Sequence, residues 1–208
     1  ENDVKVIPVA GSVAIAKRVA RVGADAVIAE GLESGGHLGE MTTMALVPQV
    51  IDAVDIPVIA AGGIGDGRGM AAAFMLGAQG VQIGTRFLTS YECNVSRPYK
   101  EAVLAAKDSS TTITGRTTGH PIRVIKNKLS RQLTQMENHG EDPEKIAELG
   151  VGALQKAVID GDVEYGSVMS GQIAGMINRE QSCKEIIEDL MRDCADVFKN
   201  RNALLDIR

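Results

Sequence analysis

The amino-acid sequence predicts an α/β protein of the parallel β/α (TIM-type) barrel class, followed by a mostly helical C-terminal extension. Short runs of apolar and β-branched residues alternate with amphipathic stretches along the first 95 residues. Each run is apolar on both faces, which is typical of parallel strands covered by helices. The runs begin about 20 to 30 residues apart, the length of one βα unit, and we count about four such units.

Four expected strands and three connecting helices make up this part of the chain. The strands are Val4–Val9, Ala26–Ala29, Pro57–Ala61 and Gly80–Ile83. The helices are Ser12–Val22, Thr43–Val54 and Met70–Leu76. We therefore expect residues 1–95 to form one part of a β/α barrel.

The character of the sequence changes after Ser96. Helices are expected at Tyr99–Ala106, Ile122–Met136, Pro143–Ile159 and Ser182–Asn200, the third of them broken by Gly150 and Gly152. In the last helix the apolar residues fall at helical spacing. We expect residues 96–208 to form a helical extension, or lid, that packs on the barrel and has no separate chemistry.

Composition argues against several classes of protein. The chain has 208 residues, of which 44% are hydrophobic and 24% are charged, as in an ordinary soluble globular protein. Its net charge of −5 argues against a general nucleic-acid binder. No apolar run reaches the roughly 18 residues of a membrane span, and Cys93, Cys183 and Cys194 show no zinc or disulfide spacing. We therefore expect a cytoplasmic enzyme without a bound metal, a nucleic-acid partner or a membrane partner.

Two glycine motifs follow two consecutive expected strands, Gly62-Gly63 after PVIAA and Gly84-Thr85 after GVQI. Glycine lets backbone N–H groups approach phosphate oxygens closely, and the Thr85 hydroxyl adds a donor. In β/α barrels, phosphate sites are frequently built from the loops after the last two strands. A single such motif is often only a tight turn, but two at adjacent strand ends predict a phosphate site.

The loop Glu30–Glu40 is the second candidate site, because it places Gly35, Gly36 and His37 after an expected strand. The glycines allow the backbone to pass close to a flat cofactor. A histidine has the unperturbed pKa that suits proton transfer near neutral pH. We therefore interpret His37 as a catalytic candidate, although a solvent-exposed loop histidine is the simpler alternative.

Other polar residues have more ordinary interpretations. Asp66 is expected to be the N-cap of the helix that follows it. The basic residues Arg123, Lys126, Lys128 and Arg131 are expected on a solvated helix face, or else they steer an acidic partner or a phosphorylated cofactor. The chain lacks the G-x-G-x-x-G turn and the Walker A lysine, which argues against a Rossmann dehydrogenase or a P-loop enzyme.

Several longer strings resemble one family of flavin enzymes. They are AEGLESGGHLGEMTTMALVPQV, IPVIAAGGIGDGRG, GAQGVQIGTRF, GHPIRVIKNKLSR and GDVEYGSVMSGQIAG, and together they extend over almost the whole chain. They closely resemble the FMN-dependent trans-2-enoyl-acyl-carrier-protein reductases of type II, which act in bacterial fatty acid biosynthesis. The wider family includes nitronate monooxygenases of the 2-nitropropane dioxygenase type, which share the GGH loop, the AAGGI strand end and the Q-x-GT motif.

The resemblance implies a barrel that binds one FMN and assigns the candidate residues. The residues that would hold the FMN phosphate are Gly62, Gly63, Gln82, Gly84 and Thr85. The residues that would line the flavin are Glu30, Ser34 and Gly35, with Met169 and Gln172 lying over the cofactor. His37 would be the catalytic histidine.

The implied activity is reduction of a trans-2-enoyl thioester on acyl carrier protein, with NADH or NADPH as cosubstrate. Reduced flavin delivers hydride to the β-carbon, while the imidazole protonates the product or polarises the carbonyl. Two alternatives stay open. One is a nitronate monooxygenase that oxidises nitroalkanes with FMN and O2, in which His37 removes the substrate proton. The other is a non-catalytic FMN-binding half-barrel.

The resemblance also sets an expectation about the rest of the barrel. In this family the barrel has eight strands, and a β/α barrel typically needs about 250 residues. The four predicted units match its second half. We therefore expect further polypeptide to close the barrel, either an N-terminal half-barrel segment or a second copy in a homodimer.

Overall fold

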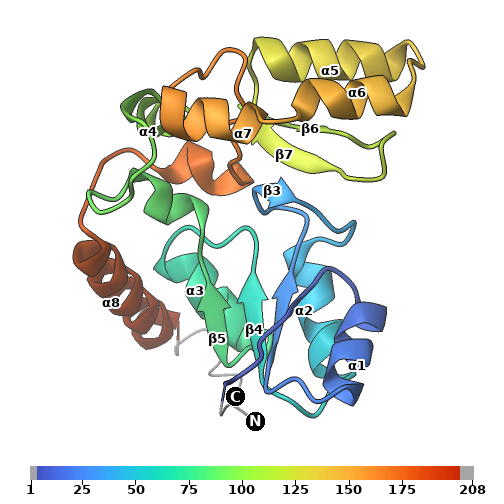
Figure 1. Cartoon of the computed structure of the whole chain (residues 1–208). Coiled ribbons are helices and arrows are strands. Elements are labelled where there is room, and N and C mark those ends of the chain that lie inside the picture. The colour runs from blue at the N-terminus through green and yellow to red at the C-terminus, as the bar shows by residue number, and fades with distance from the viewer. Residues whose placement is uncertain (1–3, 202–208) are drawn as a thin grey trace. The chain divides into compact units, whose positions relative to one another are not determined.

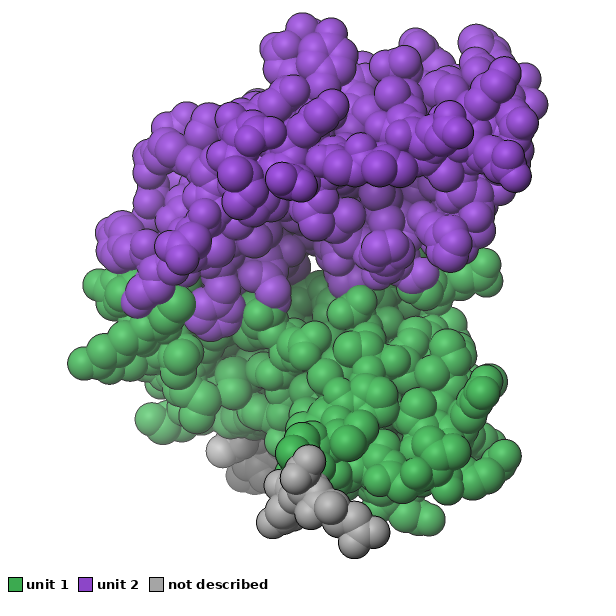
Figure 2. All heavy atoms as spheres, in the orientation of Figure 1, with its two compact units in different colours: residues 1–32, 39–83, 182–208 green, residues 33–38, 84–181 purple. Residues whose placement is uncertain are grey.

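The computed structural model describes residues 4–201, which form two compact units (Figure 2). Unit 1 comprises residues 1–32, 39–83 and 182–208, and unit 2 comprises residues 33–38 and 84–181. These bounds differ from the expected domains 1–95 and 96–208. The reason is that residues 33–38 and 84–95 belong with unit 2, whereas the last helix of the chain belongs with unit 1.

Unit 1 contains a parallel sheet with the strand order β1-β2-β4-β5 (Figure 1). Its strands are β1 (Val9–Ala10), β2 (Val27–Glu30), β4 (Val58–Ala61) and β5 (Gly80–Gln82). The helices that connect them are α1 (Val13–Arg21), α2 (Thr43–Ile51) and α3 (Gly67–Met75). Each strand therefore pairs with the next strand of the sheet along the chain, as in a β/α barrel. The predicted α/β class, with parallel strands and connecting helices, is confirmed.

Helix α3 packs against α8 (Cys183–Arg201), the last helix of the chain (Figure 1). In α8 the buried residues Ile186, Leu190 and Cys194 recur every four positions, so they form one face of the helix. A Cβ atom on Gly67 of α3 would collide with the backbone of Cys194. The close approach of the two helices therefore requires glycine at position 67.

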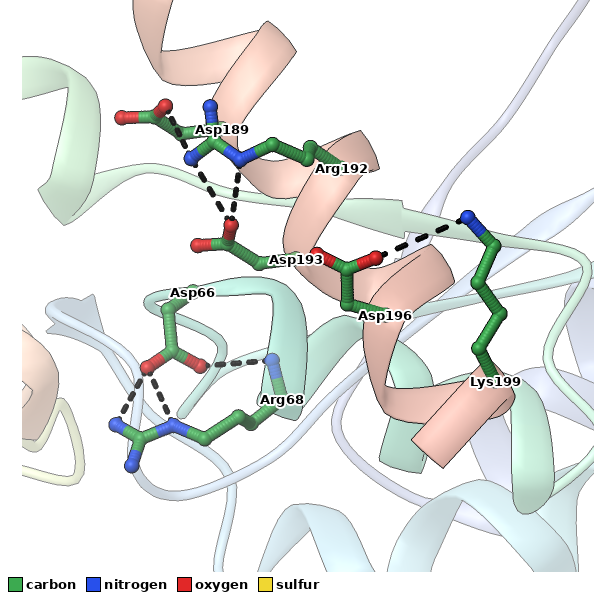
Figure 3. Close-up of polar contacts among 7 residues, drawn as sticks. All are labelled: Asp66, Arg68, Asp189, Arg192, Asp193, Asp196 and Lys199. Atoms are coloured by element: carbon green, nitrogen blue, oxygen red, sulfur yellow. Dashed lines mark hydrogen bonds and ion pairs between the residues drawn. The ribbon is translucent and has the colours of Figure 1, made fainter. Parts of the chain in front are cut away.

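Asp66 is the N-cap of α3, as predicted (Figure 3). Its carboxylate accepts the backbone N–H groups of Arg68 at 2.9 Å and Gly69 at 3.2 Å. The same carboxylate accepts a hydrogen bond from Nε of Arg68 at 2.8 Å. Two of the N–H groups that the helix leaves unpaired at its start are thus satisfied.

Unit 2 contains an antiparallel sheet with the order β3-β7-β6. Its strands are β3 (Gly36–His37), β6 (Thr111–Thr114) and β7 (Ile122–Ile125). Its helices are η1 (Thr85–Thr89), α4 (Arg97–Leu104), α5 (Lys128–Asn138), α6 (Pro143–Gly150), α7 (Ala153–Gln155), η2 (Lys156–Asp160) and η3 (Gln172–Met176). One core cluster contains Tyr99, Val103, Ile125, Val168 and Ile173. A second cluster, of Leu129, Leu133, Ile146 and Ala153, lies between α5, α6 and α7.

The helix expected at Ile122–Met136 is wrong in its first part, because residues 122–125 form β7 and the helix begins only at Lys128. Asn127 separates the two elements, since its side chain accepts the N–H of Ser130 at 2.9 Å and so starts α5. The β-branched residues of β7 pair with β6, a strand that was not expected.

The strand expected at Val4–Val9 is also wrong in most of its length, because β1 is confined to Val9–Ala10. The preceding residues still lie along β2. The carbonyl oxygens of Val6 and Pro8 accept the N–H groups of Asp25 and Ile28, each at 2.9 Å.

Candidate functional site

Four of the predicted site residues lie in unit 1, at the carboxyl ends of the strands of its sheet. Glu30 ends β2 and Gln82 ends β5, while Gly62 and Gly63 follow the end of β4. In the sheet register, Glu30 pairs with Ala61 and Ala61 pairs with Gln82. Ligands of β/α barrels bind at this end of the strands.

The turn at Gly62 and Gly63 requires glycine for reasons internal to the protein. Both residues have positive φ angles, +84° and +73°, which L side chains rarely adopt. A Cβ atom on Gly62 would lie 2.6 Å from the carbonyl oxygen of Gly31. The hydroxyl of Thr43 donates to the carbonyl of Gly62 at 2.9 Å and fixes the turn. The turn leads into the loop before α3, and a helix N-terminus is a favourable place for an anion.

Gly84, in unit 2, has neither a positive φ angle nor a close neighbour that would require glycine. Its φ of −107° and ψ of −70° lie in the right-handed region that any residue adopts. A Cβ atom built on it meets no atom within 4 Å among the described residues. The backbone here is exposed with open space beside it, which is the condition that close approach of a ligand needs.

Thr85 begins η1 and is buried. Its hydroxyl oxygen accepts the N–H of Gly171 at 2.9 Å. A hydroxyl has one donor and two acceptor positions, so this bond leaves its proton able to donate to a ligand. Thr85 therefore ties the segment around Gly171 to the start of η1.

The segment 33–38 is packed tightly against residues 170–172. The carbonyl of Glu33 accepts the N–H of Gln172 at 2.9 Å. A Cβ atom on Gly35 would lie 2.6 Å from the amide nitrogen of Gly171 and 2.8 Å from Cα of Ser170. The structure thus brings Gly35 and the buried Ser34 next to Gln172, three residues that the family resemblance assigns to one cofactor.

His37 lies on β3, at the edge of the sheet of unit 2, where it pairs with Ile122 of β7. The N–H of Leu38 donates to the carbonyl of Pro121 at 3.0 Å, so the backbone on the C-terminal side of His37 is fixed. The imidazole is exposed and makes no hydrogen bond or ion pair with residues 4–201. It is therefore available to a ligand, as a general acid or base must be.

Met169 lies beside the strand that carries His37. It forms a bridge with Val124 of β7, and its carbonyl accepts the hydroxyl of Tyr99 at 2.7 Å. Burial raises the pKa of Tyr99, so the phenol stays protonated and donates this bond. A Cβ atom on Gly36 would lie 3.5 Å from Sδ of Met169, which places the thioether against the backbone before His37.

The sequence interpretation of Arg123 is wrong. Arg123 was expected with three other cations on a solvated helix face, but it lies on β7 and is only 5% exposed. Its Nη1 donates to Oγ1 of Thr111 at 3.2 Å. Lys126, Lys128 and Arg131 are exposed as expected, but Lys126 precedes α5 and therefore does not lie on a helix. The signal that was overlooked is the β-branched run around Arg123 directly after Pro121.

The described part of the chain contains no group of three or more His, Cys, Asp or Glu side chains that could hold a metal ion. Between residues 4 and 201, no helix combines the length and the apolar character needed to cross a membrane.

The fold and the strand-end residues define a protein of the parallel β/α class with its candidate site at the carboxyl ends of the strands. The family model for nitronate monooxygenase matches residues 1–193. The chain therefore belongs to the nitronate monooxygenase family.

Three similar proteins illustrate the range of this family. The structure of FabK from Thermotoga maritima has a TM-score of 0.94 and 49% identity, covering 98% of this chain and 65% of that one. A nitroalkane oxidase from Streptomyces ansochromogenes has a TM-score of 0.80 and 31% identity, with coverages of 94% and 59%. A probable nitronate monooxygenase from Staphylococcus saprophyticus is 36% identical over 95% of this chain and 59% of its own length. The chain thus spans about three fifths of the length of these relatives.

Proposed function

We propose that the protein is an FMN-dependent enoyl-acyl-carrier-protein reductase that uses NADH or NADPH. The observation that carries this proposal is the likeness to FabK, an enoyl-acyl-carrier-protein reductase II, which exceeds the likeness to the nitroalkane oxidase in both identity and TM-score. The proposed substrate is a trans-2-enoyl chain held as a thioester on acyl carrier protein.

The properties of the individual residues support a role in holding the phosphate group of FMN. Gly84 has an exposed backbone with open space beside it, which leaves room for a phosphate group to approach closely. The hydroxyl of Thr85 keeps a proton to donate. Gly62 and Gly63, at the strand ends of unit 1, would supply backbone N–H groups, with Gln82 on the neighbouring strand.

Glu30, Ser34 and Gly35 are proposed to line the flavin, and Met169 and Gln172 are proposed to lie over it. The chemistry that FMN supplies when bound is hydride transfer from NAD(P)H to the β-carbon of the enoyl thioester. The contribution of the chain itself is to place these residues and to manage charge and protons at the substrate.

His37 is proposed to act at the α-carbon and the thioester oxygen of the substrate. Negative charge develops on the thioester oxygen as the β-carbon accepts hydride, and the α-carbon then needs a proton. An exposed imidazole on a fixed strand can stabilise that charge or donate the proton at Nε2 or Nδ1. Neither role requires the protein to form a covalent bond with the substrate.

A nitronate monooxygenase is the second candidate, favoured by the family model that matches the chain and by the relatives named for that activity. In that case His37 would remove the proton on the carbon beside the nitro group. Both candidates use the same imidazole as a proton-transfer group, so its position does not separate them.

The deciding experiment compares the two reactions on one preparation of the protein as its gene encodes it, loaded with FMN. Crotonyl thioesters of acyl carrier protein and of coenzyme A are offered with NADH or NADPH, and nitroethane is offered with O2 alone. The proposal expects oxidation of NAD(P)H that depends on the crotonyl thioester, with little oxygen uptake on nitroethane. Oxygen uptake on nitroethane without any thioester-dependent oxidation of NAD(P)H would show that the second candidate is right.

A further inference from the structure

A lysine lies on the buried face of helix α4 in unit 2. The buried residues of this helix are Tyr99, Lys100 and Val103, which share one face of an amphipathic helix. Lys100 is only 8% exposed. Lysine is almost never fully buried unless its ammonium group is paired, so this side chain needs a specific partner.

The partner of the Lys100 ammonium is a backbone carbonyl. Nζ of Lys100 donates to the carbonyl oxygen of Ser90 at 2.6 Å, and this hydrogen bond is buried. Lys100 forms no ion pair with an acidic side chain among residues 4–201. A hydrogen bond with a charged donor is stronger than a neutral one, so Lys100 holds the backbone at Ser90 firmly.

Ser90 ends a short segment that begins with Gly84 and Thr85. The N–H of Phe87 donates to the carbonyl of Gly84 at 2.9 Å, and the N–H of Ser90 donates to the carbonyl of Phe87 at 3.0 Å. These bonds make residues 85–89 the 3₁₀ helix η1, in which five steps of about 2 Å place Ser90 about 10 Å from Thr85. A cation at the carbonyl end of a helix is favourable, because those carbonyl groups carry partial negative charge. Lys100 therefore fixes one end of a helix whose other end carries two of the proposed phosphate-binding residues.

Arg86 holds the same segment at a second place. Its Nη1 donates to Oγ1 of Thr89 at 3.2 Å, and its Nη2 donates to Oε1 of Gln181. The N–H of Tyr91 donates to the carbonyl of Gln181 at 3.0 Å. The segment 84–91 is thus fixed near its start by Arg86 and at its end by Lys100.

We propose that Lys100 is a positioning residue for the phosphate group of FMN. It fixes the segment 84–91 so that the backbone of Gly84 and the hydroxyl of Thr85 meet the phosphate, and its positive charge favours an anion there. The role requires no contact between Lys100 and the cofactor. The inference rests on the proposed function, in which Gly84 and Thr85 hold the phosphate, and it adds the residue that places them.

The test compares the binding of FMN with that of riboflavin, which has the same ring system and ribityl chain but no phosphate. The variants Lys100→Met, Lys100→Gln and Lys100→Arg are made in the protein as its gene encodes it. Lys145→Met is the matched control, because Lys145 is exposed on α6 and its side chain makes no hydrogen bond or ion pair with the described residues. Fluorescence titration measures the affinity for each flavin, and hydrogen exchange measures the protection of the Ser90 amide.

We expect Lys100→Met to lower the affinity for FMN by at least about tenfold, because the segment that holds the phosphate loses a hydrogen bond with a charged donor. The affinity for riboflavin should stay within about twofold, since riboflavin has no group for that segment to bind. The Ser90 amide should exchange at least about tenfold faster, because the last turn of η1 opens more readily. Lys100→Arg keeps the charge and should recover most of both losses, and Lys145→Met should change neither.

Equal losses of affinity for FMN and riboflavin would make Lys100 a residue of general stability and overturn the proposal, as would unchanged FMN affinity in folded Lys100→Met. The carbonyl of Ser90 also accepts the N–H of Cys93 at 3.2 Å, so this variant does not leave it without a partner. If Lys100→Met does not fold, Lys100→Gln, which keeps an N–H donor and removes the charge, carries the same comparison. A wild-type protein that binds riboflavin as tightly as FMN overturns the proposed phosphate site instead, and exchange of the Ser90 amide then decides whether Lys100 holds the segment.

Discussion

At the scale of single residues, the glycines of the candidate site differ in whether the protein's own structure requires glycine at that position. Gly62 and Gly63 have positive φ angles, and Gly35 packs against the backbone of Gly171. These three are explained by the protein alone. Gly84 has an ordinary conformation and no close neighbour among residues 4–201. It is therefore the glycine that best reports on a ligand.

Gly84→Val should weaken FMN binding by at least about tenfold, which corresponds to about 1.4 kcal/mol of lost binding free energy. The valine side chain would occupy the space that lets the backbone approach the phosphate. Thermal stability without FMN should be little changed, because a Cβ atom at this position meets no atom within 4 Å among the described residues. Flavin fluorescence titration measures the affinity. Gly150→Val is the control, since a Cβ atom at Gly150 also meets nothing within 4 Å but the position lies at the end of α6.

His37→Ala should leave FMN affinity unchanged and lower turnover by about 10²- to 10⁴-fold, the usual contribution of general acid–base catalysis. The imidazole makes no hydrogen bond or ion pair with the described residues, so its removal should not disturb the fold. Stopped-flow absorbance should show slower flavin reoxidation by the enoyl thioester, with flavin reduction by NAD(P)H little affected. His120→Ala, which removes another exposed histidine, is the control. Unaltered reoxidation in the His37 variant would show that this histidine is a solvent-exposed residue without a catalytic role.

At the scale of elements, the start of α3 depends on one carboxylate. Burial raises the pKa of Asp66, but the hydrogen bonds from the side chain of Arg68 and the N–H of Gly69 outweigh it, so the pKa lies below its ordinary value. A group whose pKa is lowered by folding stabilises the folded state when it is ionised. That stabilisation is fully present above the unfolded pKa of about 3.9 and is lost as the pH falls through the folded pKa.

Asp66→Ala should therefore lower the free energy of unfolding at pH 7 by about 0.5–2 kcal/mol, the usual cost of a lost N-cap. Asp66→Asn keeps a capping oxygen and loses the charge, so it should cost less. The difference between wild type and Asp66→Asn should shrink as the pH falls from 7 to about 3. Urea unfolding at several pH values measures both effects. A difference that stays constant with pH would contradict the assignment of the effect to ionised Asp66.

A helix or strand could be predicted from the sequence where the interactions that form it join residues close together in the chain. The N-cap at Asp66 and the final helix were predictable because capping and helical spacing act within a few residues. β7 was mistaken for the start of α5 because four residues of strand are recognised only by their pairing with β6. The same error led to the wrong prediction for Arg123. A charged residue of a surface helix is expected to face solvent, whereas Arg123 lies on the central strand of a sheet and is buried. The pairing of His37 with Ile122 joins residues far apart in sequence and was not visible beforehand.

At the scale of the whole molecule, the parallel sheet of unit 1 ends in two edges. Among the described residues, β1 pairs only with β2 and β5 pairs only with β4. The chain before β1 also exposes apolar side chains, with Val4 70% and Val6 56% exposed. Apolar surface is worth about 25 cal/mol per Å² when buried, and an unpaired strand edge is a site for pairing with another strand.

We predict that further polypeptide pairs with β1 and with the residues just before it in the protein as its gene encodes it. The carbonyls of Val6 and Pro8 face β2, since they accept hydrogen bonds from Asp25 and Ile28. Alternate residues of a strand present their N–H groups to opposite sides, so those of Ile7 and Val9 face the open edge. Their amides should exchange rapidly in the 208-residue chain alone and at least about tenfold more slowly in a protein that includes this further polypeptide, because pairing removes them from water.

The amide of Ile28, inside the sheet, is the internal control and should be protected in both proteins. Two sources of the pairing strand are separated by concentration. A segment of the same chain protects Ile7 and Val9 at any protein concentration, whereas a second copy protects them only above the dissociation constant of the dimer. Sedimentation velocity on the same samples reports the oligomeric state. Fast exchange of both amides under every condition would show that this edge stays open to solvent, and the expectation of a closed barrel would then be wrong.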